Sequence, residues 1–490
     1  QTVPYNDTPS EPSQDQNSPP TLTTPIPAQD VLTAIKRSGS SVAAGPTAWH
    51  LSAIKALAPS QGCLDRIALL LSKMLHGDVP KPMLDLLASG SLTVLSKASG
   101  GIRPIVTRSS WIRLLSKVIV LKEQRPLARA LTPIQCGVGL QGGTEFMSHS
   151  IRQLSQQNPE WAVTAIDLSN AYGTVSRAFV RQQLLALREE DRPLTLAYFE
   201  RFCAPAFTVQ SGSFSMSIAE GVIQGDPLSP LFFALALQPG LTAAKNHLLD
   251  RHQHARLFAY LDDVCLVAPP QHVVSTVQAL EAAITPAHLR TNAGKTQLFS
   301  YGGPSDALDA VSNDLGVSIQ PAITILGSTI APPHSVPAED AAPLPKDEEL
   351  FTRLNSLQSL QVRLLLLRAS VSKQYIHLLR TTAPHLSIPR ANSIDKLIKT
   401  SLQGIFGLDS EPLDESIMSE ACLPLGQGGV GVPSLVETQA SAFVSSLLST
   451  IQQWRHYEPD NAPFLQQWLS SSELSAALDA VRPLVATASS

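Results

Sequence analysis

The sequence predicts a fold of the α+β class, on the basis of three patterns. Residues 256–268 are two apolar, strand-favouring runs around a short polar turn, which is typical of a β-hairpin. Residues 161–167 form another apolar run of strand length. Between these runs, residues 176–201 and 227–245 have the apolar spacing of helices. Strands interleaved with helices favour a layered domain over an all-helical bundle.

Three aspartates stand at the ends of the predicted strands. Asp262 and Asp263 occupy the turn of the hairpin, and Asp167 ends the other strand. Adjacent carboxylates beside buried strands are unfavourable unless a cation neutralises them, and their hard oxygen ligands suit Mg²⁺ or Mn²⁺. If the two strands lie side by side, the acids can hold two metal ions about 3.5–4 Å apart. The residues alone leave open an ordinary surface turn for the Asp pair and a helix N-cap for Asp167.

A Gly-Asp-Pro turn lies between these strands in the chain. In Gln224-Gly-Asp-Pro-Leu-Ser-Pro230 the turn is followed directly by an apolar helical run. We expect a helix to begin here with its positive N-terminal end exposed, which suits contact with a base or a phosphate.

The charge of the chain is small overall but unevenly distributed. The net charge is −4, whereas residues 91–130 and 351–400 each carry eight Lys or Arg and one acid, 8 − 1 = +7. Residues 401–490 carry two Arg and ten acids, 2 − 10 = −8. The two basic segments could form opposite walls of a phosphate-binding channel, or each could be a solvated helix face.

Cysteine usage and the chain ends indicate the cellular setting. The five cysteines are scattered, with neither a disulfide framework nor a zinc-binding spacing, which favours a reducing, intracellular location. No uninterrupted apolar run approaches the roughly 18 residues of a membrane span, so we expect no membrane partner. Because the chain begins at Gln1, we expect a fragment or a processed piece of a longer protein.

The two strands and the turn between them, taken in order, resemble the reverse transcriptases, and the non-LTR (LINE-type) retrotransposon branch most of all. Asp167-Leu-Ser-Asn-Ala-Tyr172 is similar to that family's first catalytic motif, and Tyr260-Leu-Asp-Asp263 to its catalytic hairpin. Gln224-Gly-Asp-Pro-Leu-Ser-Pro230 is similar to its template and nucleotide motif. Weaker likenesses fall in the family's order at 45–49, 97–105, 292–296, 325–327 and 423–431. The Leu in the hairpin motif and His288 before Leu289 depart from the family pattern.

The resemblance implies a two-metal active site. Asp167 and Asp262 would bind both Mg²⁺ (or Mn²⁺) ions, Asp263 would complete the acidic cluster, and the Leu168 carbonyl would contribute a further ligand. Lys295, in Asn292-Ala-Gly-Lys-Thr296, would protonate the departing pyrophosphate, although an ordinary solvated lysine is the alternative.

The same resemblance implies the residues that bind the substrate. Lys97 and Arg103 would neutralise the triphosphate, and Tyr172 would exclude a ribose 2′-hydroxyl. Gln224 and Gly225 would contact the nascent base pair and the template. The partners implied are an RNA template, a DNA primer and dNTPs, with an endonuclease domain upstream or separate, and the implied location is the nucleus and cytoplasm.

The implied architecture is a right-hand polymerase with fingers, a palm built on a ferredoxin-like antiparallel sheet, and a helical thumb. We divide the chain into a disordered Pro-rich leader (1–30), a helical N-terminal extension (31–90), fingers (91–160), a palm with part of the fingers inserted (161–330), a linker (331–347), a helical thumb (348–400) and an acidic helical C-terminal region (401–490). The implied activity is RNA-directed DNA synthesis. The alternatives are an RNA-dependent RNA polymerase and a decayed or domesticated copy that binds nucleic acid without catalysis.

Overall fold

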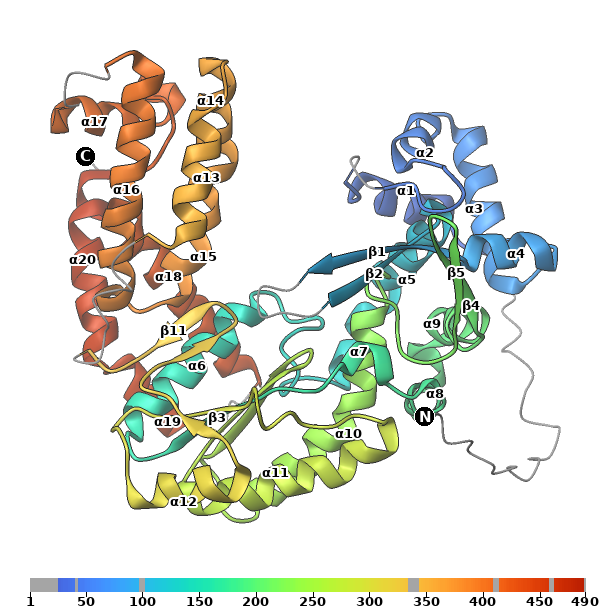
Figure 1. Cartoon of the computed structure of the whole chain (residues 1–490), viewed down its shortest axis with the longest axis horizontal. Coiled ribbons are helices and arrows are strands. Elements are labelled where there is room, and N and C mark those ends of the chain that lie inside the picture. The colour runs from blue at the N-terminus through green and yellow to red at the C-terminus, as the bar shows by residue number, and fades with distance from the viewer. Residues whose placement is uncertain are drawn as a thin grey trace. The chain divides into compact units, whose positions relative to one another are not determined.

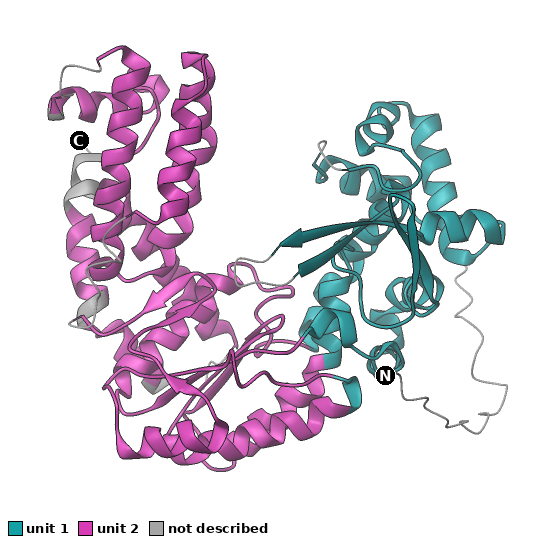
Figure 2. Ribbon diagram, in the orientation of Figure 1, with its two compact units in different colours: residues 1–130, 170–236, 286–288 teal, residues 131–169, 237–285, 289–490 magenta. Residues whose placement is uncertain are grey.

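The computed structural model describes residues 25–39, 43–96, 102–333, 343–408, 414–457 and 462–488. Most of the leader 1–30, Lys97 and the greater part of the linker 331–347 lie outside these residues. The chain forms two compact units, coloured separately in Figure 2: unit 1 (residues 1–130, 170–236 and 286–288) and unit 2 (residues 131–169, 237–285 and 289–490). Helices and strands occur in both units, which confirms the predicted α+β class.

Unit 1 is a four-stranded sheet with helices (Figure 1). Its elements are α1 (Ala28–Lys36), α2 (Leu51–Leu57), α3 (Gln61–His76), α4 (Lys81–Ala88), β1 (Gly90–Ser96), β2 (Ile102–Arg108), α5 (Ser110–Arg129), α7 (Ala171–Thr174), α8 (Arg177–Ala186), α9 (Pro193–Phe202), β4 (Phe207–Ser211), β5 (Phe214–Ile218) and the start of α10 (Ser229–Leu249). The strand order is β2-β1-β4-β5, in which only β1 and β4 are parallel.

The helix predicted over 176–201 is two helices, and the one predicted over 227–245 is α10. The Ser176 hydroxyl accepts a hydrogen bond from the amide of Phe179 and so caps α8. Pro193 then occupies the first turn of α9, where its missing N–H costs nothing, whereas within a continuous helix it would break the hydrogen-bond ladder.

Unit 2 contains a five-stranded sheet in the order β6-β7-β3-β8-β9. Its strands are β3 (Ala162–Ile166), β6 (Arg256–Tyr260), β7 (Asp263–Ala268), β8 (Gln297–Ser300) and β9 (Ser318–Ile319), and a separate pair consists of β10 (Ile323–Ile325) and β11 (Ser328–Ile330). Only β8 and β9 run parallel. The hairpin and the strand predicted from the sequence are thus confirmed, and β3 lies directly beside β7.

Helices cover the sheet of unit 2 and build a helical region beside it. They are α6 (Gly143–Gln157), the end of α10, α11 (Pro270–Ile284), α12 (Asp306–Leu315), α13 (Pro345–Asn355), α14 (Leu360–Leu366), α15 (Ile376–Thr381), α16 (Pro384–Phe406), α17 (Glu415–Cys422), α18 (Leu435–Tyr457), α19 (Ala462–Leu469) and α20 (Ser472–Ala488). Figure 1 shows α6 and α11 on opposite faces of the sheet. Helices α13 to α18 share one apolar core that includes Leu354, Leu379, Ile398 and Leu435.

An aromatic cluster joins α18, a helix of the C-terminal region 401–490, to the sheet of unit 2. The Trp454 ring stacks on Phe146 of α6 at 5.6 Å between centroids and meets Phe258 of β6 edge-on at 6.3 Å. The buried Trp454 indole N–H donates to the Ser150 hydroxyl at 2.6 Å. Despite its acidic composition, the C-terminal region is therefore packed through large apolar side chains, whose burial dominates its stability.

No helix among the described residues is both long enough and apolar enough to cross a membrane.

A buried ion pair organises the interior of unit 1. The Asp226 carboxylate accepts hydrogen bonds from the Arg108 guanidinium at 3.3 Å, the Ser116 hydroxyl at 2.8 Å and the Tyr198 hydroxyl at 2.5 Å. Burial alone would lower the pKa of Arg108, but Tyr198, Cys203 and Asp226 together raise it, so the guanidinium stays charged. Three chain segments are thereby tied to the carboxylate of a fourth.

We predict that Asp226→Ala lowers the free energy of unfolding by about 3–5 kcal/mol, because it leaves the Arg108 charge buried without its partner. The matched control is Asp85→Ala in the same unit, whose carboxylate pairs with Lys81 at the surface with 64% of the side chain exposed. Guanidinium denaturation should show a large shift for the first variant and a stability close to that of the wild type for the second. Equal shifts for the two variants would contradict this role of Asp226.

Candidate active site

The strand register of unit 2 brings the three predicted catalytic acids to one end of its sheet. In the antiparallel pair β3–β7, Ile166 lies opposite Val264, so the next residue along β3, Asp167, comes opposite Asp263. In the hairpin β6–β7, Tyr260 pairs with Asp263 and leaves Leu261 and Asp262 as the two turn residues. The strands themselves are almost wholly buried, so the apolar pairing determines where the charges lie.

Asp167 is oriented by the segment that precedes β8. The Asn292 side-chain amide donates to the Asp167 carboxylate at 3.0 Å, and the Asn292 backbone amide donates to the Asp167 carbonyl at 2.8 Å. The backbone amide of Asp167 donates to the Thr296 hydroxyl at 3.3 Å. The motif 292–296 had been recognised, but Asn292 and Thr296 had not been predicted as site residues. The signal was available, since both side chains can hydrogen-bond to a carboxylate or its backbone.

Leu168 and Lys295 lie next in sequence to, or a few residues from, the contact between Asp167 and Asn292. Leu168 forms an isolated antiparallel bridge with Thr291. The two hydrogen bonds of this bridge involve the Asp167 carbonyl and the Ser169 amide, so the Leu168 carbonyl takes no part in them. Lys295 is exposed in the turn that follows Asn292.

The acidic cluster accumulates negative charge. Asp263 is accessible to solvent, yet partial desolvation by the surrounding protein raises the pKa of its carboxyl to about 6, and the charges of Asp262 and Asp167 add to this rise. A neighbouring carboxylate raises the pKa of Asp263 because ionising like charges close together is unfavourable. A bound cation would reverse that effect.

The donor chemistry of the cluster fits a hard divalent cation. Three carboxylates supply the oxygen ligands that Mg²⁺ and Mn²⁺ prefer. Within the described ranges, no group of three or more His, Cys, Asp and Glu side chains lies close enough together to hold a metal ion.

In unit 1, the Gln224–Gly225 turn lies against the strand that carries Arg103. The Val106 amide of β2 donates to the Gln224 carbonyl at 3.1 Å. Gly225 has φ +122°, and a Cβ at this position would come within 2.8 Å of the Val106 carbonyl oxygen. Only glycine permits so close an approach. Arg103 is exposed on β2, three residues before Val106.

Tyr172 is held in a fixed position in the same unit. Its ring stacks on Phe233 of α10 at 4.7 Å between centroids, with the planes 16° apart. Its carbonyl accepts from the Val222 amide at 2.8 Å. Gly221 passes so close that a Cβ there would lie 2.6 Å from the Tyr172 carbonyl oxygen. The half-buried ring thus packs against α10, while the backbone of Tyr172 is held by the segment that leads to Gln224.

The prediction of an exposed positive end for α10 is wrong. The Asp226 carboxylate accepts from the Leu228 amide at 2.9 Å, immediately before the first residue of the helix, so an acid of the chain itself lies at this end. Leu228 is fully buried and Ser229 is 2% exposed. The Gly-Asp-Pro motif therefore anchors the helix inside unit 1 and presents Gln224 and Gly225, not the helix end, at the surface.

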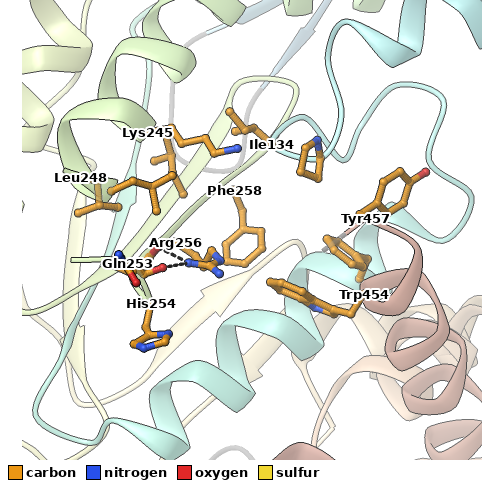
Figure 3. A pocket seen from close by; sticks show the side chains of 14 residues that line it. Ile134, Lys245, Leu248, Gln253, His254, Arg256, Phe258, Trp454 and Tyr457 are labelled. Carbon is orange, nitrogen blue, oxygen red and sulfur yellow. Dashed lines mark hydrogen bonds between the residues drawn. The ribbon is translucent and has the colours of Figure 1, made fainter. Parts of the chain in front are cut away.

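A pocket of about 460 Å³ lies beside β6 in unit 2 (Figure 3). Phe258, Trp454 and Tyr457 line it together with the cationic side chains of Lys245 and Arg256. The Arg256 guanidinium lies 6.0 Å from the Trp454 ring centroid and donates to the Gln253 and Ala255 carbonyls. No carboxylate is present among the described residues of its lining, so the pocket lacks the ligand chemistry of the acidic cluster.

Comparisons with known proteins relate the chain to a family and to two other proteins. Residues 95–330 match the model of the family Reverse transcriptase (RNA-dependent DNA polymerase). The chain is 24% identical over 443 residues, 89% of its length, to the Retrotransposable element SLACS 132 kDa protein of Trypanosoma brucei gambiense, and it spans 36% of that relative. A weaker likeness links it to a structure of apo telomerase from Candida tropicalis truncated from the C-terminal domain, with 15% identity, a TM-score of 0.36, and coverage of 50% of this chain and 53% of that one.

The family match spans β2, the Gln224–Gly225 turn, the acidic cluster and the sheet of unit 2. Together with the mixed α+β architecture, it agrees with the right-hand polymerase fold expected from the sequence. Residues 95–330 of this chain therefore form a reverse transcriptase domain, and the chain as a whole is a distant relative of a retrotransposable-element protein.

Proposed function

We propose that this chain is an RNA-directed DNA polymerase of a non-LTR retroelement, which adds dNTPs to the 3′-hydroxyl of a primer. The observation that supports this proposal most is that the strand register brings Asp167, Asp262 and Asp263 to the same end of the β6-β7-β3 sheet, within residues 95–330 that match the reverse transcriptase family. Phosphoryl transfer needs positioning and charge neutralisation more than it needs a reactive side chain, and a carboxylate cluster of this kind serves both purposes.

Asp167 and Asp262 would hold two Mg²⁺ or Mn²⁺ ions, with Asp263 and the Leu168 carbonyl as further ligands. The chemistry supplied by two such ions is activation of the attacking hydroxyl and stabilisation of the leaving pyrophosphate. Asn292 would keep the Asp167 carboxylate turned toward the cluster through its 3.0 Å hydrogen bond. Its amide carries no charge, so it orients the ligand without competing for the cation.

The remaining site residues would bind the substrates. Arg103 and Lys97 would neutralise the triphosphate, where the planar fork of Arg103 suits phosphate oxygens. Tyr172, braced against Phe233, would exclude a 2′-hydroxyl. Gln224 and Gly225 would contact the nascent base pair and the template, and Lys295 would protonate the pyrophosphate.

The partners of this activity are an RNA template, a DNA primer and dNTPs. Residues 91–160 would serve as fingers, 161–330 as palm and 348–400 as thumb, after the extension 31–90. Target cleavage would come from an endonuclease domain upstream or separate, and the chain would act in the nucleus and cytoplasm. The basic segments 91–130 and 351–400 would supply the electrostatic attraction for nucleic acid.

We predict that Asp262→Asn lowers kcat for primer extension on an RNA template by more than about a hundredfold, since a lost ligand should cost more than the 10–100-fold typical of a lost second-sphere partner. The control is Asp306→Asn at the start of α12 in the same unit, an exposed acid outside the cluster. Extension should be measured with dNTPs and Mg²⁺ or Mn²⁺. Full activity of Asp262→Asn would exclude the proposed mechanism.

We predict that Tyr172→Ala lowers the preference for dNTPs over rNTPs by at least about tenfold, because the steric barrier to the 2′-hydroxyl is lost. Tyr172→Phe is the matched control, since it retains the ring that stacks on Phe233. The measurement is kcat/KM for each nucleotide class. Unchanged sugar discrimination in Tyr172→Ala would remove this residue from the selection step.

A further inference from the structure

The turn that carries Asp262 has a strained backbone. Leu261 and Asp262 connect β6 to β7, and Leu261 has φ +57°. Two-residue hairpin turns with positive φ at the first position normally place glycine there, because a Cβ disfavours that conformation. A leucine in this position needs support from the surrounding structure.

Gln135 supplies that support from a distant part of unit 2. Its side-chain carbonyl accepts from the Leu261 amide at 2.7 Å, and its side-chain amide lies 3.4 Å from the Leu261 carbonyl, to which it donates. One side chain therefore binds both polar backbone groups of the strained residue. Gln135 is fully buried, which strengthens these hydrogen bonds and makes their loss costly.

The loop that bears Gln135 is fixed to the same strand. The Ala259 amide donates to the Ile134 carbonyl at 2.8 Å, and the Cys136 amide donates to the Ala259 carbonyl at 2.6 Å, so the loop pairs with the outer edge of β6. The Gly137 amide donates to the Gln135 side-chain carbonyl at 3.1 Å. A Cβ on Gly137 would lie 2.9 Å from the Leu261 amide nitrogen, so this close approach requires glycine.

We propose that Gln135 is a positioning residue of the catalytic hairpin: its side-chain amide holds Leu261 in the left-handed conformation and thereby sets the direction in which Asp262 points. The inference rests on the proposed polymerase function for its consequence in catalysis. Its structural part, the contact between Gln135 and the backbone of Leu261, stands without that function.

The first test is the kinetic effect of Gln135→Leu, which approximately preserves size and removes both hydrogen bonds to Leu261 together with the one from the Gly137 amide. We expect kcat for primer extension to fall about 10–100-fold, the range typical of residues that orient a ligand, while KM for dNTP changes less than about twofold. Gln439→Leu is the matched control, because Gln439 is 2% exposed in the same unit and bonds to Ser387 on helices away from the hairpin. Its kcat should stay near that of the wild type.

The second test is rescue by the double variant Gln135→Leu/Leu261→Gly. Glycine adopts positive φ without assistance, so the double variant should recover at least about tenfold of the lost kcat. A role of Gln135 in packing alone would give no recovery, because Leu261→Gly removes still more side-chain volume. Where Gln135→Leu fails to fold, Gln135→Asn serves instead, since its shorter amide cannot reach Leu261.

The third test does not use activity. In the metal-free protein, the Leu261 amide should exchange its hydrogen at least about tenfold faster in Gln135→Leu than in the wild type or in Gln439→Leu. Wild-type kcat and unchanged exchange in Gln135→Leu would overturn the inference, as would a kcat loss that Leu261→Gly does not restore. A wild-type chain without primer extension would overturn the proposed function instead, and the exchange experiment would still decide the role of Gln135.

Discussion

The antiparallel register between β3 and β7 is the constraint on which the site depends. Packing of the apolar residues on both covered faces of the sheet favours this register, because a slip of one residue would exchange the side chains between the two faces and disrupt their packing. The same register sets Asp167 opposite Asp263, and like charges opposed across a sheet are destabilising. Hydrophobic pairing thus holds the acids at one end of the sheet despite their repulsion, and the pKa of Asp263 is raised by desolvation first and by the charges of Asp262 and Asp167 in addition.

The residues around these acids differ in kind from those around the buried acid of unit 1. Asp226 is enclosed by a guanidinium and two hydroxyls, so its charge is cancelled inside the protein and its role is structural. The Asn292 side-chain amide donates to the Asp167 carboxylate, and the Asp167 backbone amide donates to the Thr296 hydroxyl, so both partners are neutral. Neutral partners orient a carboxylate and leave its charge available to a cation, which is the property that a metal ligand requires.

Glycine and positive φ recur where segments approach one another closely. Gly225 permits the approach to β2 in unit 1, and Gly137 permits the approach to the hairpin turn in unit 2. At Leu261 the chain instead retains a leucine with positive φ, supported by Gln135. This arrangement couples the turn to a loop that lies 126 residues earlier in the sequence.

Much of the fold and the site was accessible from the sequence alone. The hairpin around Asp262 and Asp263, the strand before Asp167, and the helix after the Gly-Asp-Pro turn follow from local apolar patterns, which have a short range and a clear period. The break of 176–201 into α8 and α9 was missed although Ser176 and Pro193 mark it.

Tertiary structure alone decided the rest. The burial of Asp226 beneath the start of α10, the anchoring of α18 through Trp454, and the contact of Gln135 with Leu261 depend on partners far away in sequence, and no local pattern specifies which buried polar group will meet which.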